Sequence, residues 1–360
     1  MLSRTCLDWL CLLTSLNRLS LLCPQLCGLP EECLDTITCR LDAHDIGNLW
    51  KCGNIGFNAR LAQGGVTKFE LPFSSRAKIV WPRMVSDFRK LRHFRLKYEA
   101  EIPWINVEDF SWSLVPRQLV KLQLCLDKLA PIDTDLVFPH LDYMSLSWLQ
   151  ASKPSEGPLY YVEPIEPLMD LRLSAPNLRT LQLFPASTLF IPLHAAYVPP
   201  NLTSLAGRFS SLTDRIRDAY LWPSTLTELF LEGSFTPHFA SLQPSLPPSL
   251  TSLTVCGPSL VRADTLDWSM SKLPKLSTLG VRASGLTTEH LKQLPSRITS
   301  LDLYEQIANN TKLLLLSLPK NLVSLHGTRC RVPDEVIPAL PRTLTDFPCF
   351  SQSSSALAHL

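Results

Sequence analysis

Apolar residues recur in one short pattern along most of the chain. Segments such as APNLRTLQLF, WPSTLTELFL and LPSRITSLDL share the kernel P-x-(x)-L-x-x-L-x-L, in which a polar residue separates the last two apolar positions. That alternation is typical of a β-strand with one buried face. Each kernel therefore predicts a short strand. The proline before it has a fixed φ and no amide hydrogen, so it predicts a corner where the chain enters the strand.

The kernel occurs twelve times, and successive copies lie 22 to 28 residues apart except for one gap of 37. Its first apolar position is held by Val66, Leu91, Leu119, Leu141, Leu178, Leu202, Leu226, Leu250, Leu276, Ile298, Leu322 and Leu344. One strand and its return segment cannot bury their apolar face alone, so the repeat predicts a solenoid of stacked units. The return segments are too short and variable for uniform long helices.

The repeat resembles the leucine-rich repeat over about residues 63 to 350. The resemblance implies an α/β solenoid with a parallel sheet on its concave face, built to bind another macromolecule. The family often has asparagine three residues after the last kernel leucine. The corresponding positions in this chain hold Asp127, Ala186, Ser234, Pro258 and Gln306. We therefore expect the turns to be held by other groups.

One stretch departs from the regular repeat. The segment LMDLRLS, residues 168–174, lies too close to Leu178 to begin a full unit. We expect residues 147–177 to be an insertion or an irregular coil.

Residues 28–54, before the repeats, have helical rather than strand spacing. Pro30 suits the first turn of a helix whose apolar residues Leu34, Ile37 and Leu41 recur at i, i+3 and i+7. Asp45 can cap a second short helix. Three short helices of this kind bury too little surface to be stable alone, so we expect them to dock on the solenoid or on a partner.

This segment resembles an F-box. The residues that match the family pattern are Leu29, Pro30, Glu32, Leu34, Ile37, Leu41, Asp45, Leu49 and Cys52. The resemblance implies that residues 29–62 bind a Skp-type adaptor of a cullin-based (SCF-type) ubiquitin ligase, and that the repeats hold the client protein. The match weakens after Cys52, where residues 53–56 are GNIG instead of the bulky basic and tryptophan residues of the family.

Two other interpretations of the amino-terminal segment remain open. It can be a helical cap that shields the first strand of a scaffold with no connection to ubiquitin. It can also be the cysteine cap of a secreted repeat protein, with LCLLTSL as part of a signal peptide, although Asp8 and Arg18 interrupt that apolar stretch. The expected domains are an apolar, cysteine-rich leader (1–28), the F-box-like segment (29–62), the solenoid (63–350) and a polar tail (351–360).

Composition narrows the class of partner and the compartment. The 34 basic and 32 acidic residues leave a formal charge of +2, which favours neither nucleic acid nor an acidic membrane as partner. The eleven cysteines include no Cys-x-x-Cys pair and are odd in number, which favours reduced thiols. We therefore expect a cytoplasmic or nuclear protein.

The chain lacks the common sequence signatures of catalysis. It contains no phosphate-binding glycine loop, no His-Glu-x-x-His and no Gly-x-Ser-x-Gly. His44 lies between Cys39 and Cys52, but this spacing fits no structural zinc site. We expect a non-enzymatic protein without metal or cofactor.

The alternation of each strand also predicts the side chains on the concave face. Basic residues crowd the early repeats, and acidic residues appear later. Aromatic and arginine side chains are common anchors at interfaces. The candidate client-binding residues are Arg95, Lys97, Tyr143, Phe184, Arg208, Phe230, Arg282 and Tyr304. The alternative for any one of them is that it only solvates an open sheet.

Overall fold

The computed structural model describes fourteen stretches of the chain. They are residues 68–72, 90–97, 112–126, 135–148, 170–185, 198–209, 222–233, 243–256, 261–284, 286–303, 315–326, 331–332, 338–347 and 350–351. The segment 29–62, and with it every predicted adaptor-binding residue, lies outside these stretches.

The chain divides into two compact units. The first consists of Met1–Leu159, Leu168–Leu178 and Pro185–Ser187, and the second of Tyr160–Pro167, Arg179–Phe184 and Thr188–Leu360. The boundary falls beside the long gap between the fourth and fifth kernels.

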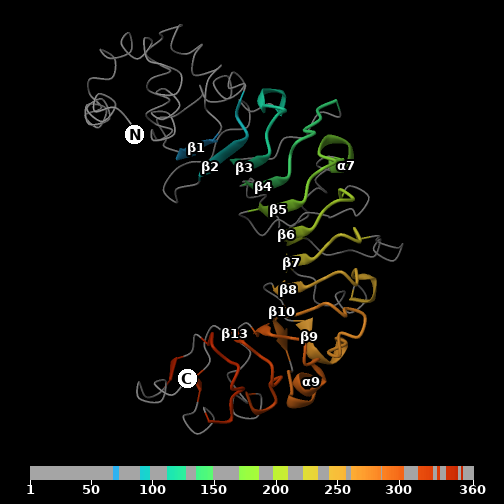
Figure 1. The fold of residues 1–360 in the computed structure, drawn as a ribbon, viewed down its shortest axis with the longest axis vertical. Coiled ribbons are helices and arrows are strands. Elements are labelled where there is room, and N and C mark those ends of the chain that lie inside the picture. The colour runs from blue at the N-terminus through green and yellow to red at the C-terminus, as the bar shows by residue number, and fades with distance from the viewer. Residues whose placement is uncertain are drawn as a thin grey trace, which may run out of the picture. The chain divides into compact units, whose positions relative to one another are not determined.

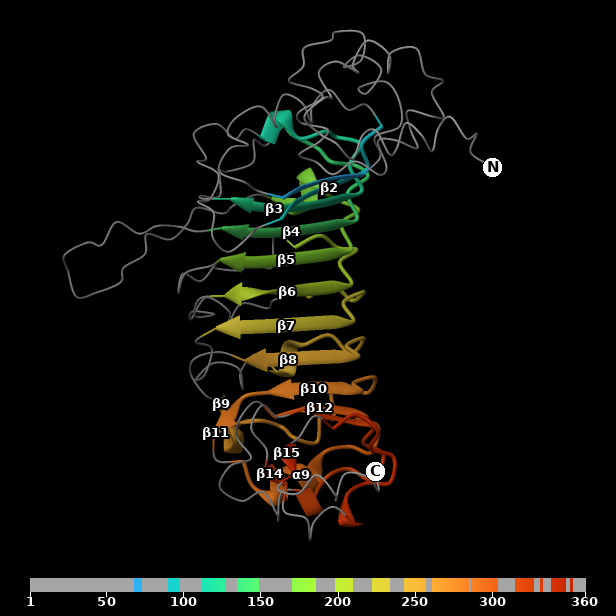
Figure 2. The ribbon, with the colours of Figure 1, turned by 90° about the vertical axis from the view of Figure 1, so that its left-hand side faces the viewer.

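The kernels form parallel strands in both units, as the sequence predicts. The first unit contains, in spatial order, β1 (Lys68–Pro72), β2 (His93–Lys97), β3 (Lys121–Leu126) and β4 (Tyr143–Trp148). The second contains β5 (Thr180–Pro185), β6 (Ser204–Phe209), β7 (Glu228–Gly233), β8 (Ser252–Cys256), β10 (Thr278–Val281), β12 (Ser300–Asp302) and β13 (Ser324–His326). Figure 2 shows β5 to β8 and β10 lying side by side and pointing the same way. In each unit the fold is a solenoid with a parallel sheet.

The twelfth kernel contributes less than the other eleven. Instead of a strand it forms a single bridge between Asp346 and Ser324. The backbone amide of Leu325 donates to the carbonyl oxygen of Asp346 at 2.9 Å. At this kernel the parallel pairing therefore consists of a single residue pair, Ser324 with Asp346.

The kernel leucines form the interior. At the first apolar position, Leu119, Leu202 and Leu276 are fully buried, and Leu344 is 4% exposed. The next kernel position is also buried, as at Leu253. Stacked units thus bury the stripe that one unit alone would expose, which is the physical basis of the repeat.

The prolines mark the corners before the strands, in two arrangements. In one, the proline carbonyl accepts a hydrogen bond from the amide three residues later, as Pro223 does from Leu226 at 3.0 Å. In the other, the acceptor is the residue before the proline, as when Leu273, which precedes Pro274, accepts from Leu276 at 3.1 Å. Both are the hydrogen bond of a β-turn.

Hydroxyl groups link the corner of each repeat to the corner of the next repeat. The residue after the first kernel position is usually threonine or serine, and its hydroxyl donates to the carbonyl of the equivalent residue one unit earlier. The pairs are Thr203 to Arg179, Thr227 to Thr203, Thr251 to Thr227, Ser277 to Thr251 and Thr299 to Ser277, at 3.0 to 3.4 Å. We call this series the corner hydroxyl ladder. The ladder supplies groups that hold the turns before the strands. The turn positions after the strands lie outside the described residues; they are Asp127, Ala186, Ser234, Pro258 and Gln306.

Where the structure describes the return segments, the helices in them are short, as expected. They are η3 (Trp112–Leu114), α7 (Leu171–Ser174), η6 (Gln243–Ser245), η7 (Ala263–Thr265) and α9 (Thr288–Gln293). The structure also contains two short parallel strand pairs outside the main sheet. They are β9 (Val261–Arg262) with β11 (Ala283–Ser284), and β14 (Arg331–Val332) with β15 (Phe350–Ser351).

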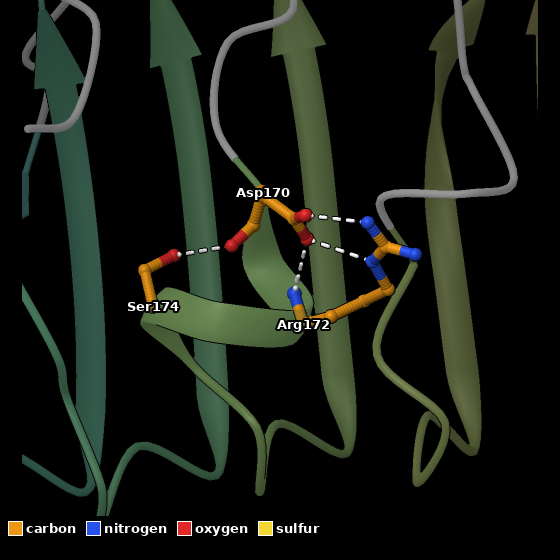
Figure 3. Close-up of polar contacts among 3 residues, drawn as sticks. All are labelled: Asp170, Arg172 and Ser174. Carbon is orange, nitrogen blue, oxygen red and sulfur yellow. Dashed lines mark hydrogen bonds and ion pairs between the residues drawn. The ribbon is translucent and has the colours of Figure 1, made fainter. Parts of the chain in front are cut away.

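Part of the irregular stretch 147–177 forms the short helix α7. Within LMDLRLS, residues 171–174 are this single helical turn and not a strand, so the segment does not begin a repeat unit. Asp170 caps the turn: its carboxylate accepts from the Arg172 backbone amide at 3.1 Å and from the Arg172 guanidinium, and the Ser174 hydroxyl donates to its carbonyl at 3.0 Å (Figure 3). These contacts close the turn locally.

Candidate functional site

One face of several strands is partly open to solvent. On β8, Leu253 and Val255 are buried, while Ser252, Thr254 and Cys256 alternate with them and are half-buried. We use the name open face for the strand residues that alternate in this way with the buried kernel positions. It is the surface on which the sequence places the candidate client-binding residues.

On the first unit, the open face of β2 and β3 is rich in basic residues. Arg95 and Lys121 are exposed, and His93 is half-buried. In the strand register, His93 lies opposite Lys121, which in turn lies opposite Tyr143. The sheet therefore collects basic side chains that are 28 residues apart in the sequence beside the half-buried Tyr143.

On the second unit, two predicted aromatic residues meet. The rings of Phe184 on β5 and Phe230 on β7 have centroids 6.3 Å apart with an interplanar angle of 63°, an edge-to-face contact. Strand β6 runs between them and presents Ala206, the register partner of Phe230. A methyl group at this position leaves room for the two rings to approach across β6. Both rings are half-buried, so part of each remains open to solvent.

An ion pair lies on the neighbouring strands. The Arg208 Nε atom is 2.9 Å from a carboxylate oxygen of Glu232, its register partner on β7. Both side chains are partly exposed, so water screens the pair and its effect on stability is small. Together with Phe184 and Phe230 it combines apolar, cationic and anionic surface within three adjacent strands. Such a mixture suits a protein surface better than a small substrate.

The remaining candidates are placed only in part. Arg282 follows β10 directly and is half-buried, and its amide donates to the Val255 carbonyl at 3.0 Å. Lys97 is the last residue of β2, but its side chain lies outside the described set. Tyr304 also lies outside it. The role of all eight residues in client binding stays a prediction.

A serine, a histidine and an aspartate cluster at the last strand, which sequence reasoning missed. The Ser324 hydroxyl donates to an Asp346 carboxylate oxygen at 2.9 Å and lies 2.7 Å from His326 Nε2, which is 3.1 Å from that same oxygen. In a catalytic triad the aspartate contacts the other ring nitrogen and the serine proton points to the histidine. Here Asp346 contacts Nε2, the same ring nitrogen that faces Ser324, so the arrangement differs from a triad. The available signal was Asp346 itself, at a kernel position that the fifth to eleventh repeats fill with serine, threonine or glutamate.

The described residues contain no group of three or more His, Cys, Asp or Glu side chains placed to hold a metal ion. Within the same residues, no helix combines the length and apolar character needed to cross a bilayer.

Comparison with known proteins adds little. No protein-family model matches the chain, and no curated protein matches it. A solved structure that is similar to it is the leucine-rich repeat-containing protein LegL7 from Legionella pneumophila, with 13% sequence identity and a TM-score of 0.33 over 79% of this chain and 83% of that one. So distant a match carries no weight. The solenoid is instead established by the parallel strands and buried kernels of the chain itself.

Proposed function

We propose that this chain is a non-catalytic protein-binding solenoid that holds a client protein on the open face of its strands. The observation that carries the proposal is the group formed by Phe184, Phe230 and the Arg208–Glu232 pair. Aromatic and arginine side chains that are already held in place lose little side-chain entropy on binding, so they make effective anchors.

The test compares the proteins captured by three forms of the full chain. The first is unaltered, the second carries Phe184→Ala and Phe230→Ala, and the third carries Leu173→Ala and Leu316→Ala. Leu173 and Leu316 are 64% and 48% exposed and lie outside the strands, so the third form removes exposed apolar surface from elsewhere. Quantitative mass spectrometry should show clients lost from the second form and retained by the third. Equal capture by all three forms would contradict the proposal.

We further propose that residues 29–62 connect the solenoid to a Skp-type adaptor, which would make the chain the substrate-recognition subunit of a cullin-based ubiquitin ligase in the cytoplasm or nucleus. This finer role is supported by the F-box-like residues of that segment, from Leu29 to Leu49. The alternative is a repeat scaffold, possible also as a secreted protein, in which the same segment only caps the solenoid.

Co-purification with a purified Skp-type adaptor separates these two roles. The full chain should bind the adaptor, and Leu34→Asp should abolish binding because it places a charge on the apolar stripe of the first expected helix. Thr36→Asp introduces the same charge off that stripe and should leave binding intact. If the unaltered chain does not bind the adaptor, the ligase role fails and the client-binding proposal is unaffected.

A further inference from the structure

The open face of β2 and β3 places basic side chains on adjacent strands. His93 and Lys121 are register partners, and neighbouring strands of a sheet are about 4.8 Å apart. Arg95 lies two residues along β2 from His93, opposite Gln123. We call His93, Arg95 and Lys121 the basic group.

Strand β1 does not remove this excess of positive charge. Its register places Glu70 opposite Arg95, but it also places Lys68 opposite His93. Strand β1 therefore adds one acidic residue, Glu70, and one basic residue, Lys68, and leaves the net charge of this part of the sheet unchanged.

Two basic side chains elsewhere on the open face lie beside an acidic one. Arg208 has Glu232 as its partner on the next strand, and His326 has Asp346. Within the described stretches, by contrast, neither Arg95 nor Lys121 forms an ion pair, although both side chains are exposed. The missing negative charge can come from a bound molecule.

We propose that the open face of β2 and β3 binds an acidic segment of a partner protein, with carboxylates taken by the basic group. This inference rests on the proposed client-binding function and names the chemistry of the client. The Arg95 guanidinium offers a paired set of donors that match a carboxylate, Lys121 adds a point charge, and Tyr143 lies opposite Lys121.

A short acidic protein segment fits this surface better than nucleic acid. The basic group is small, and the formal charge of the whole chain is only +2. Acidic clients are therefore favoured.

The experiment measures binding of a dye-labelled decapeptide of alternating glutamate and serine to the full chain by fluorescence anisotropy. Arg95→Glu with Lys121→Glu reverses two charges of the basic group. Lys272→Glu with Lys275→Glu makes the same change in net charge at two exposed residues of the turn before β10. We expect the first pair to weaken binding about tenfold or more, the second pair to change it less than about twofold, and added salt to weaken binding to the unaltered chain.

Three outcomes would overturn the inference: no binding of the acidic peptide to the unaltered chain, equal binding by both double variants, or equal binding of a peptide with glutamine in place of glutamate. Tighter binding of a single-stranded oligonucleotide that is lost in the Arg95→Glu, Lys121→Glu form would also overturn it in favour of nucleic acid. Circular dichroism checks that each variant folds, and Arg95→Gln with Lys121→Gln replaces the reversal pair if that pair does not fold. If the peptide fails while the Phe184→Ala, Phe230→Ala form still loses its clients, only this inference falls.

Discussion

At the scale of single residues, the corner hydroxyl ladder shows how a side chain after the first kernel position stabilises the contact between units. Each ladder carbonyl already accepts backbone amide hydrogen bonds, as Thr203 does from Thr227 and Glu228. The hydroxyl of Thr227 adds a further bond at 3.0 Å. Val323 occupies the next ladder position after Thr299 and has no hydroxyl to donate, although its side chain is 42% exposed.

The ladder gives two stability changes of opposite sign. Thr227→Val keeps the shape of the side chain and removes one hydrogen bond, so it should lower the free energy of unfolding by about 0.5–1.5 kcal/mol. Val323→Thr should raise it by a similar amount by donating to the Thr299 carbonyl. Urea denaturation of both variants checks this. A lower stability for Val323→Thr would show that the ladder hydroxyls do not stabilise the stack.

The lowered pKa of the Asp170 carboxyl should make the stability of the protein depend on pH. The side-chain hydrogen bond from Arg172 is the main cause that lowers the pKa of Asp170 below its usual value. A carboxyl whose pKa is lowered by folding stabilises the protein above its unfolded pKa of about 4, and that contribution is lost as the pH falls through the lowered folded value. The free energy of unfolding should therefore fall less steeply with acid in Asp170→Asn than in the unaltered chain.

Asp170→Ala serves as the comparison, because it removes the cap as well as the charge. It should cost about 1 kcal/mol at neutral pH. Denaturation at a series of pH values from 7 down to about 2.5 measures both effects, since the range spans the usual carboxyl pKa. Parallel curves for the unaltered chain and Asp170→Asn would show that this carboxylate is not coupled to folding.

At the scale of elements, the contact between β8 and β10 depends on the absence of a side chain at Gly280. A Cβ atom there would lie 2.9 Å from Thr254 Oγ1 and 3.0 Å from Thr254 Cγ2, and Thr254 is its register partner. Gly280→Ala should therefore destabilise the chain by about 1–3 kcal/mol, as overpacking does.

A second variant tests the cause. In a Thr254→Ala background both crowded atoms are gone, so Gly280→Ala should be neutral or stabilising because alanine restricts the unfolded chain. Thermal or urea unfolding of the four forms gives the coupling between the two positions. An equal cost of Gly280→Ala in both backgrounds would exclude steric contact with Thr254 as the cause.

At the scale of the whole molecule, a stacked array is held by nearest-neighbour contacts, so its last unit should be the least protected. Ser277 and Thr278 donate to the Thr251 carbonyl at 2.9 and 3.0 Å, and Thr345 and Asp346 donate to the Val323 carbonyl at 2.9 and 3.1 Å. These bonds are alike in length, but Thr278 lies on a strand paired on both sides and Asp346 forms only a single bridge.

Hydrogen exchange followed by NMR measures this difference. The amides of Thr345 and Asp346 should exchange about tenfold faster or more than those of Ser277 and Thr278. Equal protection would mean that the array unfolds as a single cooperative unit out to its last kernel.

The sequence by itself determined the repeat, the strands and the face on which each strand residue lies. It could do so because burial by stacking requires the same apolar pattern in every unit, so Leu226, Leu229 and Leu231 are all buried as their spacing predicts. It also indicated the corners, because proline fixes its own backbone. The full strand predicted at the last kernel, at Leu344, is replaced by a single bridge. The sequence carried a signal for this, because the kernel continues as Phe347 and Pro348, and proline has no amide hydrogen for pairing with a neighbouring strand.

Only the tertiary structure decided which residues of different units meet. The contact between Phe184 and Phe230, the Arg208–Glu232 pair and the opposition of His93 to Lys121 depend on strand register. The register aligns the same kernel position in successive repeats, as with Ser204, Glu228 and Ser252, although the return segments differ in length. The kernel does not determine which open-face side chains touch, because these positions vary from repeat to repeat. The kernels therefore encode the scaffold locally, while the chemistry of its open face arises from neighbours that are some twenty to fifty residues apart in the chain.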